Sequence, residues 1–403
     1  MTTLPPPDDV VSLLQQMVRQ DTVNTTASGR RHPEQPLSQH LESLAQAWGL
    51  QTRRLPVHTP TPPEQGDNLL VTYEADRSLP WLMFDSHLDT VSVAGMTIDP
   101  FSGEVRDGKL FGRGSCDTKG TGAAMLWALR QYAAGTHHPR NIALLFSVDE
   151  EVGMTGVASF LTHDLPALGF RPEGVIVGEP TELHPVVAHN GTLRWKLIAH
   201  GKAAHSSVPH EGRSAIAMML HAIDAIDRQY IARLSAEHPL TGPAVCSINV
   251  IQGGTAVNII PDRCQVQIDR RLVPGETAEP VMPEVLRLAG ESLPDAGDGY
   301  LDDLPDPPFT QEKLVYHPPL TDATNGDLLA LAKAVLKQMG LPTLHLGAPF
   351  GTHAGFFSQA GVPAIVLGPG DAARAHQASE WLDLDQLHKG VALYHGLMTA
   401  EPG

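Results

Sequence analysis

Cysteine is scarce in this sequence, and long apolar runs are missing. The three cysteines of the 403-residue chain, Cys116, Cys246 and Cys264, are odd in number and far apart. Such spacing fits neither a disulfide framework nor a cysteine-rich zinc site, and it is expected of a protein in the reducing cytoplasm. No apolar run approaches the roughly 20 residues that a membrane span requires. We therefore expect neither a disulfide-bonded nor a membrane-spanning protein.

Basic segments are missing as well. The formal net charge is −17, and no tract of Lys and Arg interrupts it. Nucleic acid and acidic membrane surfaces are therefore not expected as partners. The first residues, MTTLPPPDDVV, lack the basic region and apolar core of a signal peptide, which again favours the cytoplasm.

The length and the order of apolar segments predict two domains. A chain of 403 residues is too long for one ordinary core. Strands and helices alternate as far as Val177, which predicts an α/β catalytic domain with a mixed, mainly parallel sheet covered by helices. After Val187 the order becomes strand, helix, strand, strand, helix, which predicts an inserted ferredoxin-like α+β domain. The expected domains are residues 1–188 and 313–403 for the catalytic domain and 189–312 for the inserted lid or dimerisation domain, with the Asp- and Pro-rich segment Gly297–Pro319 leading back.

The stretch WLMFDSHLDTV, residues 81–91, places polar side chains at the end of a predicted buried strand. Ligands of open α/β sheets bind beyond the carboxyl ends of the strands. His87 and Asp89 are two residues apart, so on an extended chain they point to the same side. A carboxylate beside an imidazole can fix its tautomer and leave the other nitrogen for a metal ion. Taken alone, a His and an Asp in a polar loop explain the stretch equally well.

Four further segments carry candidate ligands. Asp117 lies in GRGSCDTKG, where it could also be an ordinary helix N-cap. Glu150 and Glu151 lie in SVDEEVG, where adjacent acids repel one another unless a cation is present; an exposed acidic turn is the alternative. Glu179 in GEPTE could be a turn residue, and His376 in GPGDAARAHQASEW could be a structural histidine.

Together these segments supply a complete donor set for two metal ions. Two imidazoles and three carboxylates can hold two divalent ions if one carboxylate bridges, and zinc accepts both donor types. The five candidate ligands are His87, Asp117, Glu151, Glu179 and His376. Metal pairs about 3.5–4 Å apart serve in the hydrolysis of amides and phosphates. The remaining acid, Glu150, could act as general base.

At this point the sequence resembles a known family. The ordered motifs SHLDT, GRGSCDTKG, DEEVG, GEPT, GKAAHSS and GPG…AHQASEW resemble those of the co-catalytic zinc aminoacylases and metallopeptidases, which include acetylornithine deacetylase, succinyl-diaminopimelate desuccinylase, aminoacylase and glutamate carboxypeptidase. The resemblance covers nearly the whole chain. It implies two ions, zinc or alternatively cobalt or manganese, bridged by Asp117.

The resemblance also implies a role for each ligand. One ion would bind His87 and Glu179, and the other Glu151 and His376. Asp89 would orient His87, Glu150 would be the general base, and the peptide bond between Asp117 and Thr118 would be cis.

For the inserted domain the resemblance implies substrate contacts. His205, in AHGKAAHSSVPHEG, matches a histidine that stabilises the tetrahedral oxyanion, often from the partner subunit of a dimer. Asn258 and Arg271 match positions that contact the substrate carboxylate, for which the planar fork of Arg is suited. The adjacent Arg270 is a rival for that role.

A late loop, FGTHAGFF, matches a segment on the substrate side of the family site. Gly351 and Thr352 belong to the matching part. The family pattern is GTDA or GTEA, so His353 replaces an acid here, and a contact between that acid and a substrate amine is lost.

The sequence and its resemblance therefore predict a cytoplasmic, zinc-dependent amidohydrolase, and the resemblance alone implies a homodimer through the inserted domain. Its predicted reaction is cleavage of an N-acyl amino acid, as in acetylornithine deacetylase. A metallo-exopeptidase of the dipeptidase or glutamate carboxypeptidase type is the alternative. A non-catalytic binding protein would be expected to have lost a ligand or the base, and the net charge of −17 argues against a phosphatase or nuclease with polyanionic substrates.

Overall fold

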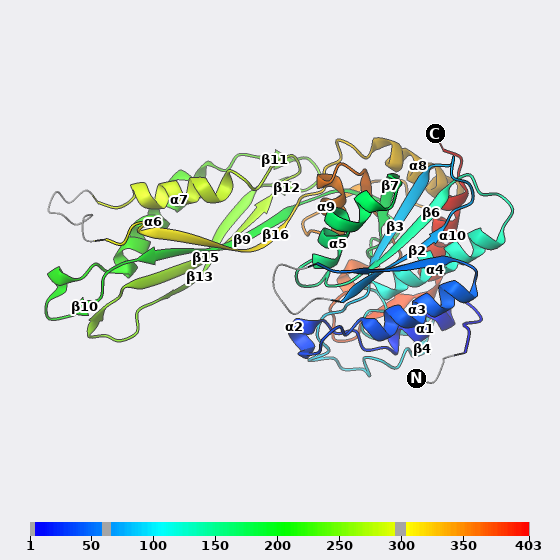
Figure 1. Ribbon diagram of the computed structural model, residues 1–403, viewed down its shortest axis with the longest axis horizontal. Coiled ribbons are helices and arrows are strands. Elements are labelled where there is room, and N and C mark those ends of the chain that lie inside the picture. The colour runs from blue at the N-terminus through cyan, green and yellow to red at the C-terminus, as the bar shows by residue number, and fades with distance from the viewer. Residues whose placement is uncertain (1–4, 59–65, 295–303, 403) are drawn as a thin grey trace. The chain divides into compact units, whose positions relative to one another are not determined.

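The computed structural model describes residues 5–58, 66–294 and 304–402. Residue contacts divide it into two compact units, unit 1 with residues 1–188, 320–347 and 352–403, and unit 2 with residues 189–319 and 348–351 (Figure 1). Unit 2 extends beyond the predicted return after residue 312. The reason is that part of Gly297–Pro319, predicted to be a connection, forms strand β16 (Phe309–His317); residues 297–303 lie outside the described part of the chain.

Unit 1 is built on an eight-stranded sheet with the order β1-β2-β6-β3-β7-β18-β8-β17. The neighbours β6, β3, β7 and β18 are parallel, whereas β1, β2 and β8 join antiparallel. The predicted mixed α/β fold is thus confirmed. The strands are β1 (Gln51–Pro56), β2 (Asp67–Tyr73), β3 (Trp81–His87), β6 (Asn141–Ser147), β7 (Pro172–Val177), β8 (Val186–His189), β17 (Leu346–Ala348) and β18 (Ala364–Val366).

Helices cover both faces of this sheet. On β3, the ring of Phe84 lies 5.8 Å from that of Tyr394 in α10, while the next residue, Asp85, contacts His353 in α9. Because alternate residues of a strand point to opposite faces, α10 and α9 lie on different sides. Burial of both faces explains why β6, NIALLFS, is a continuous apolar run. The helices of unit 1 are α1 (Val10–Val18), α2 (Thr25–Ser28), α3 (Gln35–Ala47), α4 (Lys119–Ala134), α5 (Thr155–Ser159), α8 (Gly326–Gln338), α9 (His353–Gln359) and α10 (Leu384–Thr399).

The start of α4 packs closely on strand β3, near its carboxyl end. A Cβ at Gly122 would lie 2.8 Å from Oγ of Ser86 on β3, so only glycine allows this approach. The hydroxyl of Ser86 donates to the carbonyl of Thr118 at 3.4 Å. The turn before α4, which contains Asp117, is thereby held beside the end of β3.

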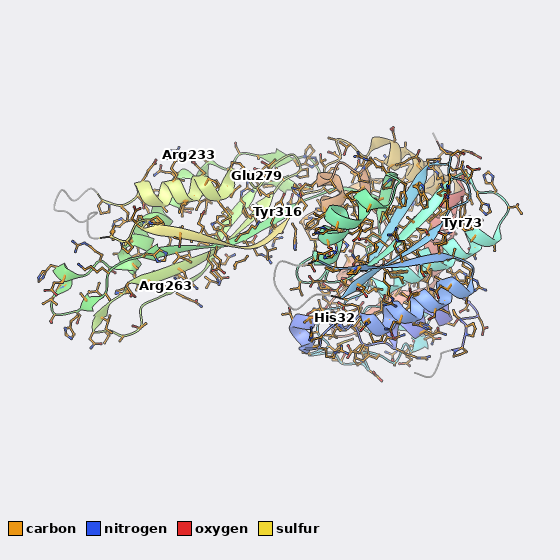
Figure 2. The ribbon with its side chains drawn as sticks, viewed as in Figure 1. His32, Tyr73, Arg233, Arg263, Glu279 and Tyr316 are labelled. Atoms are coloured by element: carbon orange, nitrogen blue, oxygen red, sulfur yellow. The ribbon has the colours of Figure 1, made fainter. Side chains whose placement is uncertain are left out.

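Unit 2 has the order strand, helix, strand, strand, helix, strand. Its four-stranded antiparallel sheet has the order β13-β15-β9-β16, the ferredoxin-like arrangement, and β16 is the strand that the prediction lacked. Helices α6 and α7 share a core with Trp195 and Val266, and Tyr316 of β16 packs against it (Figure 2). The elements are β9 (Gly191–His200), α6 (Ala215–Gln229), β13 (Val245–Gly253), β15 (Arg263–Leu272) and α7 (Val281–Glu291).

Short strands complete both units. The pairs β19–β5 and β10–β14 join segments that are distant in the sequence, whereas β4–β5 and β11–β12 are hairpins of only two or three residues a strand. In unit 1, β19 pairs with β5, which pairs with β4; in unit 2, β10 pairs with β14 and β11 with β12. Their bounds are β4 (Val105–Arg106), β5 (Lys109–Phe111), β10 (Ala204–His205), β11 (Glu237–His238), β12 (Gly242–Pro243), β14 (Ile259–Ile260) and β19 (Trp381–Asp383). Among the described residues, no helix combines the length and apolar character that a membrane crossing demands.

Candidate metal centre

The candidate ligands of unit 1 gather at one edge of its sheet. The strands β6, β3, β7 and β18 are neighbours, so their carboxyl ends lie next to one another (Figure 1). His87 is the last residue of β3, and Glu151, Glu179 and His376 follow β6, β7 and β18. Asp117 comes instead from the turn between β5 and α4. It therefore does not follow a strand of the main sheet, and it is not the helix N-cap that the sequence offered as the alternative, because the N-cap of α4 is Thr118.

Asp117 lies at the centre of this arrangement. Its Oδ1 is 3.1 Å from Nε2 of His87, and its Oδ2 is 3.2 Å from Nε2 of His376. Glu179 lies 3.9 Å from the first imidazole and Glu151 lies 3.2 Å from the second. The five side chains form two groups that share Asp117, and within each group one ligand atom per residue lies within 4.8 Å of the others. This is the geometry expected of two ion sites bridged by one carboxylate.

The charges of the site favour cations. Burial raises the pKa of Glu150 and Glu179 well above the ordinary value and also raises that of Glu151. Burial opposes ionisation of Asp117 too, but hydrogen bonds from both imidazoles lower its pKa. Hydrogen bonds to Asp117 and Glu151 raise the pKa of His376 to about 10. Without metal ions the cluster therefore holds protons, and divalent ions that replace them fit this donor set.

Asp89 organises the centre in two ways. The Nδ1 of His87 is 3.0 Å from the main-chain carbonyl oxygen of Asp89 and 3.5 Å from its Oδ1. The tautomer with a proton on Nδ1 donates to this carbonyl and leaves Nε2 for an ion. The carboxylate of Asp89 accepts the main-chain N–H groups of Glu150 and Glu151 at 2.9 and 3.0 Å. Asp89 thus orients His87 and also fixes the segment that carries the predicted base.

Glu34, just before α3, is a buried acid that no sequence motif marks. Its side chain belongs to the buried polar set, at 4% exposure. Burial, and next the negative charge of Asp89, raise its pKa to about 8. Glu34 therefore holds a proton at neutral pH close to the residue that orients His87.

His353 has a buried partner. Its Nδ1 lies 2.8 Å from Oδ2 of Asp85 and 3.3 Å from Oγ of Ser147, and Ser147 donates to Oδ1 of Asp85 at 3.0 Å. Asp85 lies on β3 two residues before His87, and Ser147 ends β6. The histidine that replaces the family acid thus pairs with an acid on the sheet.

Unit 2 contains the predicted residues His205, Asn258 and Arg271. His205 on β10 pairs with Ile259 on β14, and the N–H of Ser206 donates to the carbonyl of Asn258 at 3.0 Å. His205 and Asn258 are therefore neighbours. His205 is exposed, and its Nδ1 lies 2.7 Å from Oγ of Ser207.

The two adjacent arginines of β15 point to opposite faces of its sheet. Arg270 is 1% exposed and donates to the Tyr230 hydroxyl and to Glu276, at 3.2 and 2.6 Å, so it is part of the core. Arg271 is partly exposed and donates to Thr192 at 3.0 Å and to Asp269 at 2.8 Å. Of the two, Arg271 is the one that solvent can reach.

The predicted loop residues Gly351 and Thr352 lie at a unit boundary. Gly351 closes the last segment of unit 2, and Thr352 opens the last segment of unit 1. Thr352 is the N-cap of α9, where its hydroxyl accepts the N–H of Ala354 at 3.2 Å.

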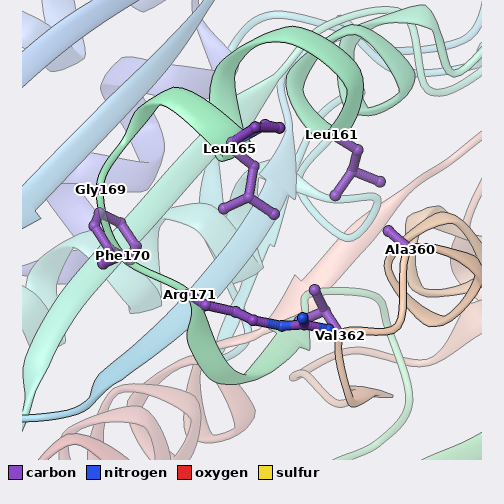
Figure 3. Close-up of a pocket in the computed structure, with 8 residues that line it drawn as sticks. Leu161, Leu165, Gly169, Phe170, Arg171, Ala360 and Val362 are labelled. Atoms are coloured by element: carbon purple, nitrogen blue, oxygen red, sulfur yellow. The ribbon is translucent and has the colours of Figure 1, made fainter.

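A pocket of about 420 Å³ lies elsewhere in unit 1 (Figure 3). Its lining is mostly apolar, with Leu165, Phe170 and Val362 on its wall, and Arg171 donates to the carbonyl of Gly361 at 2.6 Å. None of the candidate ligands lines this pocket. It offers no acid or nucleophile for the chemistry of the metal centre.

Two donor groups that share Asp117 at the carboxyl ends of parallel strands, with Glu150 nearby, form the kind of site expected of a metal-dependent hydrolase. Residues 83–400 match the sequence profile of Peptidase family M20/M25/M40. The chain belongs to this family, and it is a hydrolase that acts on amide bonds. The resemblance seen in the sequence is thus confirmed.

Solved structures share the fold over nearly the full chain. The aminopeptidase PepT from Bacillus cereus has 20% sequence identity and a TM-score of 0.74, with 97% of each chain covered. The M20 family metallo-carboxypeptidase Sso-CP2 from Sulfolobus solfataricus has 16% identity and a TM-score of 0.76, with 98% of this chain and 99% of that chain covered. The YXEP protein of Bacillus subtilis, described as a dinuclear metal binding peptidase from the M20 family, has 15% identity and a TM-score of 0.68, with 97% of this chain and 96% of that chain covered.

Metal binding is expected to release protons and to strengthen as pH rises. The raised pKa of His87 and His376 means that both imidazoles carry protons at neutral pH in the metal-free protein, and an ion must displace them. A histidine whose pKa is higher in the folded than in the unfolded state stabilises the folded, metal-free protein. This stabilisation is fully present below the pKa of the unfolded state and is lost as pH rises through the pKa of the folded state. The gain in melting temperature on adding Zn²⁺ should therefore grow from pH 6 to pH 8. Calorimetric titration in buffers of different ionisation enthalpy measures the protons released.

The variant His221→Ala, far along the sequence in α6, is the control. Binding of Zn²⁺ that does not depend on pH and releases no protons would contradict this account.

Proposed function

We propose that this protein hydrolyses the amide of an N-acyl amino acid, as acetylornithine deacetylase does, to release a carboxylate and a free amino acid. The observation that carries the proposal is the pair of donor groups that share Asp117, with Glu150 beside them. Two zinc ions, or alternatively cobalt or manganese, would be held by His87, Asp117, Glu151, Glu179 and His376. When bound, they would supply the polarisation of the substrate carbonyl and the acidification of water.

Glu150 is the proposed general base. It belongs to neither donor group, although the adjacent Glu151 belongs to one. Its main-chain N–H is fixed by Asp89, which holds its side chain near the ligands. Glu150 takes a proton from the attacking water and later gives it to the leaving amine, so that no proton is left over at the end of the cycle.

Residues of unit 2 are proposed to bind the substrate. Arg271 and Asn258 would contact the substrate carboxylate, since a guanidinium binds a carboxylate through two parallel hydrogen bonds. The exposure of Arg271 supports this choice over the buried Arg270. Gly351 and Thr352 would complete the substrate loop. His205 would donate a hydrogen bond to the developing oxyanion, whose stabilisation is usually the largest contribution in acyl transfer.

A substrate panel tests the reaction. Purified protein is analysed for metal content and assayed with N-acetyl, N-formyl and N-succinyl amino acids and with dipeptides. We expect close to two ions per chain and one preferred N-acyl amino acid. Two ions with turnover of dipeptides alone would contradict the deacylase proposal, and failure to bind zinc, cobalt or manganese would contradict the two-ion site.

A metallo-exopeptidase is the second candidate. Structures with the same fold include an aminopeptidase from Bacillus cereus and a metallo-carboxypeptidase from Sulfolobus solfataricus. Both classes of substrate carry an amide beside a carboxylate or an amine, and the same ions and base would serve either. In the panel, this candidate predicts that dipeptides exceed every N-acyl amino acid in kcat/KM.

The variant Glu150→Gln is expected to retain both ions and to lose kcat by about 10²–10⁴-fold, the usual contribution of general acid–base catalysis. The amide keeps the size of the side chain and removes its basicity. Steady-state kinetics and metal analysis measure the two effects. Glu182→Gln, an exposed acid after Glu179, is the matched control and should behave as the wild type. Near-normal turnover by Glu150→Gln would exclude Glu150 as the base.

We also propose a cytoplasmic homodimer that forms through unit 2. The free cysteines support the location. Strand β13 lies at the edge of its sheet and exposes Val245 and Ile251, at 50% and 54%, and exposed edges of this kind pair readily with a second copy.

In a mixed dimer, His205→Ala is expected to complement a metal-site variant. Each variant alone should lose kcat, while His205→Ala keeps its ions. If His205 acts in the partner's site, each mixed dimer has one intact site. Mixing the two variants then restores about a quarter of the wild-type activity when subunits combine at random, and about a half when every dimer is mixed. Light scattering gives the mass, and Ile251→Lys should weaken the dimer. A monomeric wild type would contradict both statements.

A further inference from the structure

Glu380 connects two candidate ligands that are distant in the sequence. It lies four residues after His376 and is fully buried, at 0% exposure. Its Oε1 accepts the main-chain N–H groups of Cys116 and Asp117, both at 3.0 Å. Its Oε2 accepts from Nη1 of Arg113 at 2.6 Å. Both oxygens of this carboxylate thus hold the turn that carries Asp117.

The main chain places Glu380 without help from an ion. Directly after it, β19 pairs with β5, with Trp381 opposite Phe111. The N–H of Gly112 then donates to the carbonyl of Glu380 at 3.0 Å. Arg113 is itself anchored, because its Nη2 donates to the carbonyl of Ser92 at 3.0 Å. The carboxylate is therefore fixed in front of the turn by hydrogen bonds on both sides.

We propose that Glu380 is a positioning residue that holds Asp117 at a fixed distance from His376 before an ion binds. The inference rests on the two-ion site of the proposed function. Asp117 and His376 belong to the same donor group, yet 258 residues separate them, from 117 to 376. Glu380 contacts the main chain of the first and lies on the segment of the second. Preorganised ligands bind an ion more tightly, because no free energy is then used to bring them together.

A carboxylate is required for this role. Hydrogen bonds to a charged acceptor are roughly twice as strong as those between neutral groups. In Glu380→Gln one oxygen can still accept from the main chain, but the amide N–H₂ then faces the guanidinium of Arg113, and two donors meet. The turn is expected to shift, and Asp117 with it. In Glu380→Asp the charge stays opposite Arg113, but the shorter side chain cannot reach both groups.

Ion binding tests the proposal independently of any substrate. Calorimetric titration with Zn²⁺ alone is carried out on the wild type, Glu380→Gln and Glu380→Asp, each checked for folding by circular dichroism. We expect at least one of the two ions to bind 10–100-fold more weakly in both variants, the usual effect of losing a residue that orients a ligand.

Glu173→Gln is the matched control. Glu173 accepts from Arg140 at 2.8 Å, and this arginine is as buried as Arg113, at 3% side-chain exposure each. The control should bind both ions as the wild type does. Wild-type affinity for both ions in either folded Glu380 variant would overturn the proposal, even if its melting temperature fell. Failure of the wild type itself to bind two ions would show instead that the two-ion site is wrong.

Discussion

The constraint on which this structure depends is the repulsion among carboxylates that a parallel sheet brings to one edge. Four neighbouring strands end together, and the segments after them carry acids that burial would rather keep protonated. The imidazoles of His87 and His376 relieve part of this repulsion, because each of them lies beside one oxygen of Asp117. The rest is relieved only by protons or by cations. The burial that raises the pKa of these acids therefore also favours the binding of cations at this end of the sheet.

Most of the centre could be predicted from the sequence, because its ligands follow contiguous apolar strands. His87, Glu151 and Glu179 stand at or just beyond the end of a buried strand, His376 lies in the longer segment after β18, and parallel strands must end at the same side. Asp117 could be identified from its glycine-rich motif, but its position in a turn after β5 was not predicted. The resemblance to a known family added the roles, and the family match of residues 83–400 confirmed the resemblance itself.

What could not be predicted depends on pairing between distant segments. Strand β16 follows a stretch rich in Asp and Pro, and it exists because β9 offers a free edge. Nothing in the sequence distinguishes Glu380 from other acids. Only the pairing of β19 with β5 places its carboxylate against the main-chain N–H of Asp117. Glu34 carries no motif, and only its burial marks it; Asp85 lies in the stretch 81–91, but its contact with the distant His353 is visible only in the structure. By contrast, the choice between Arg270 and Arg271 follows from strand alternation once the register of β15 is known.

The insertion of unit 2 has a consequence for how the centre forms in the cell. During synthesis His87, Asp117, Glu151 and Glu179 are made first, then residues 189–319 of unit 2, and His376 and Glu380 after them. Domains tend to fold as units while the chain is still growing. While unit 2 is being made, three acids and one imidazole are thus present without the second imidazole and without Glu380, the residue proposed to hold Asp117. The donor group of His87, Asp117 and Glu179 is therefore complete before unit 2 is made, whereas the group of Asp117, Glu151 and His376 is complete only after it.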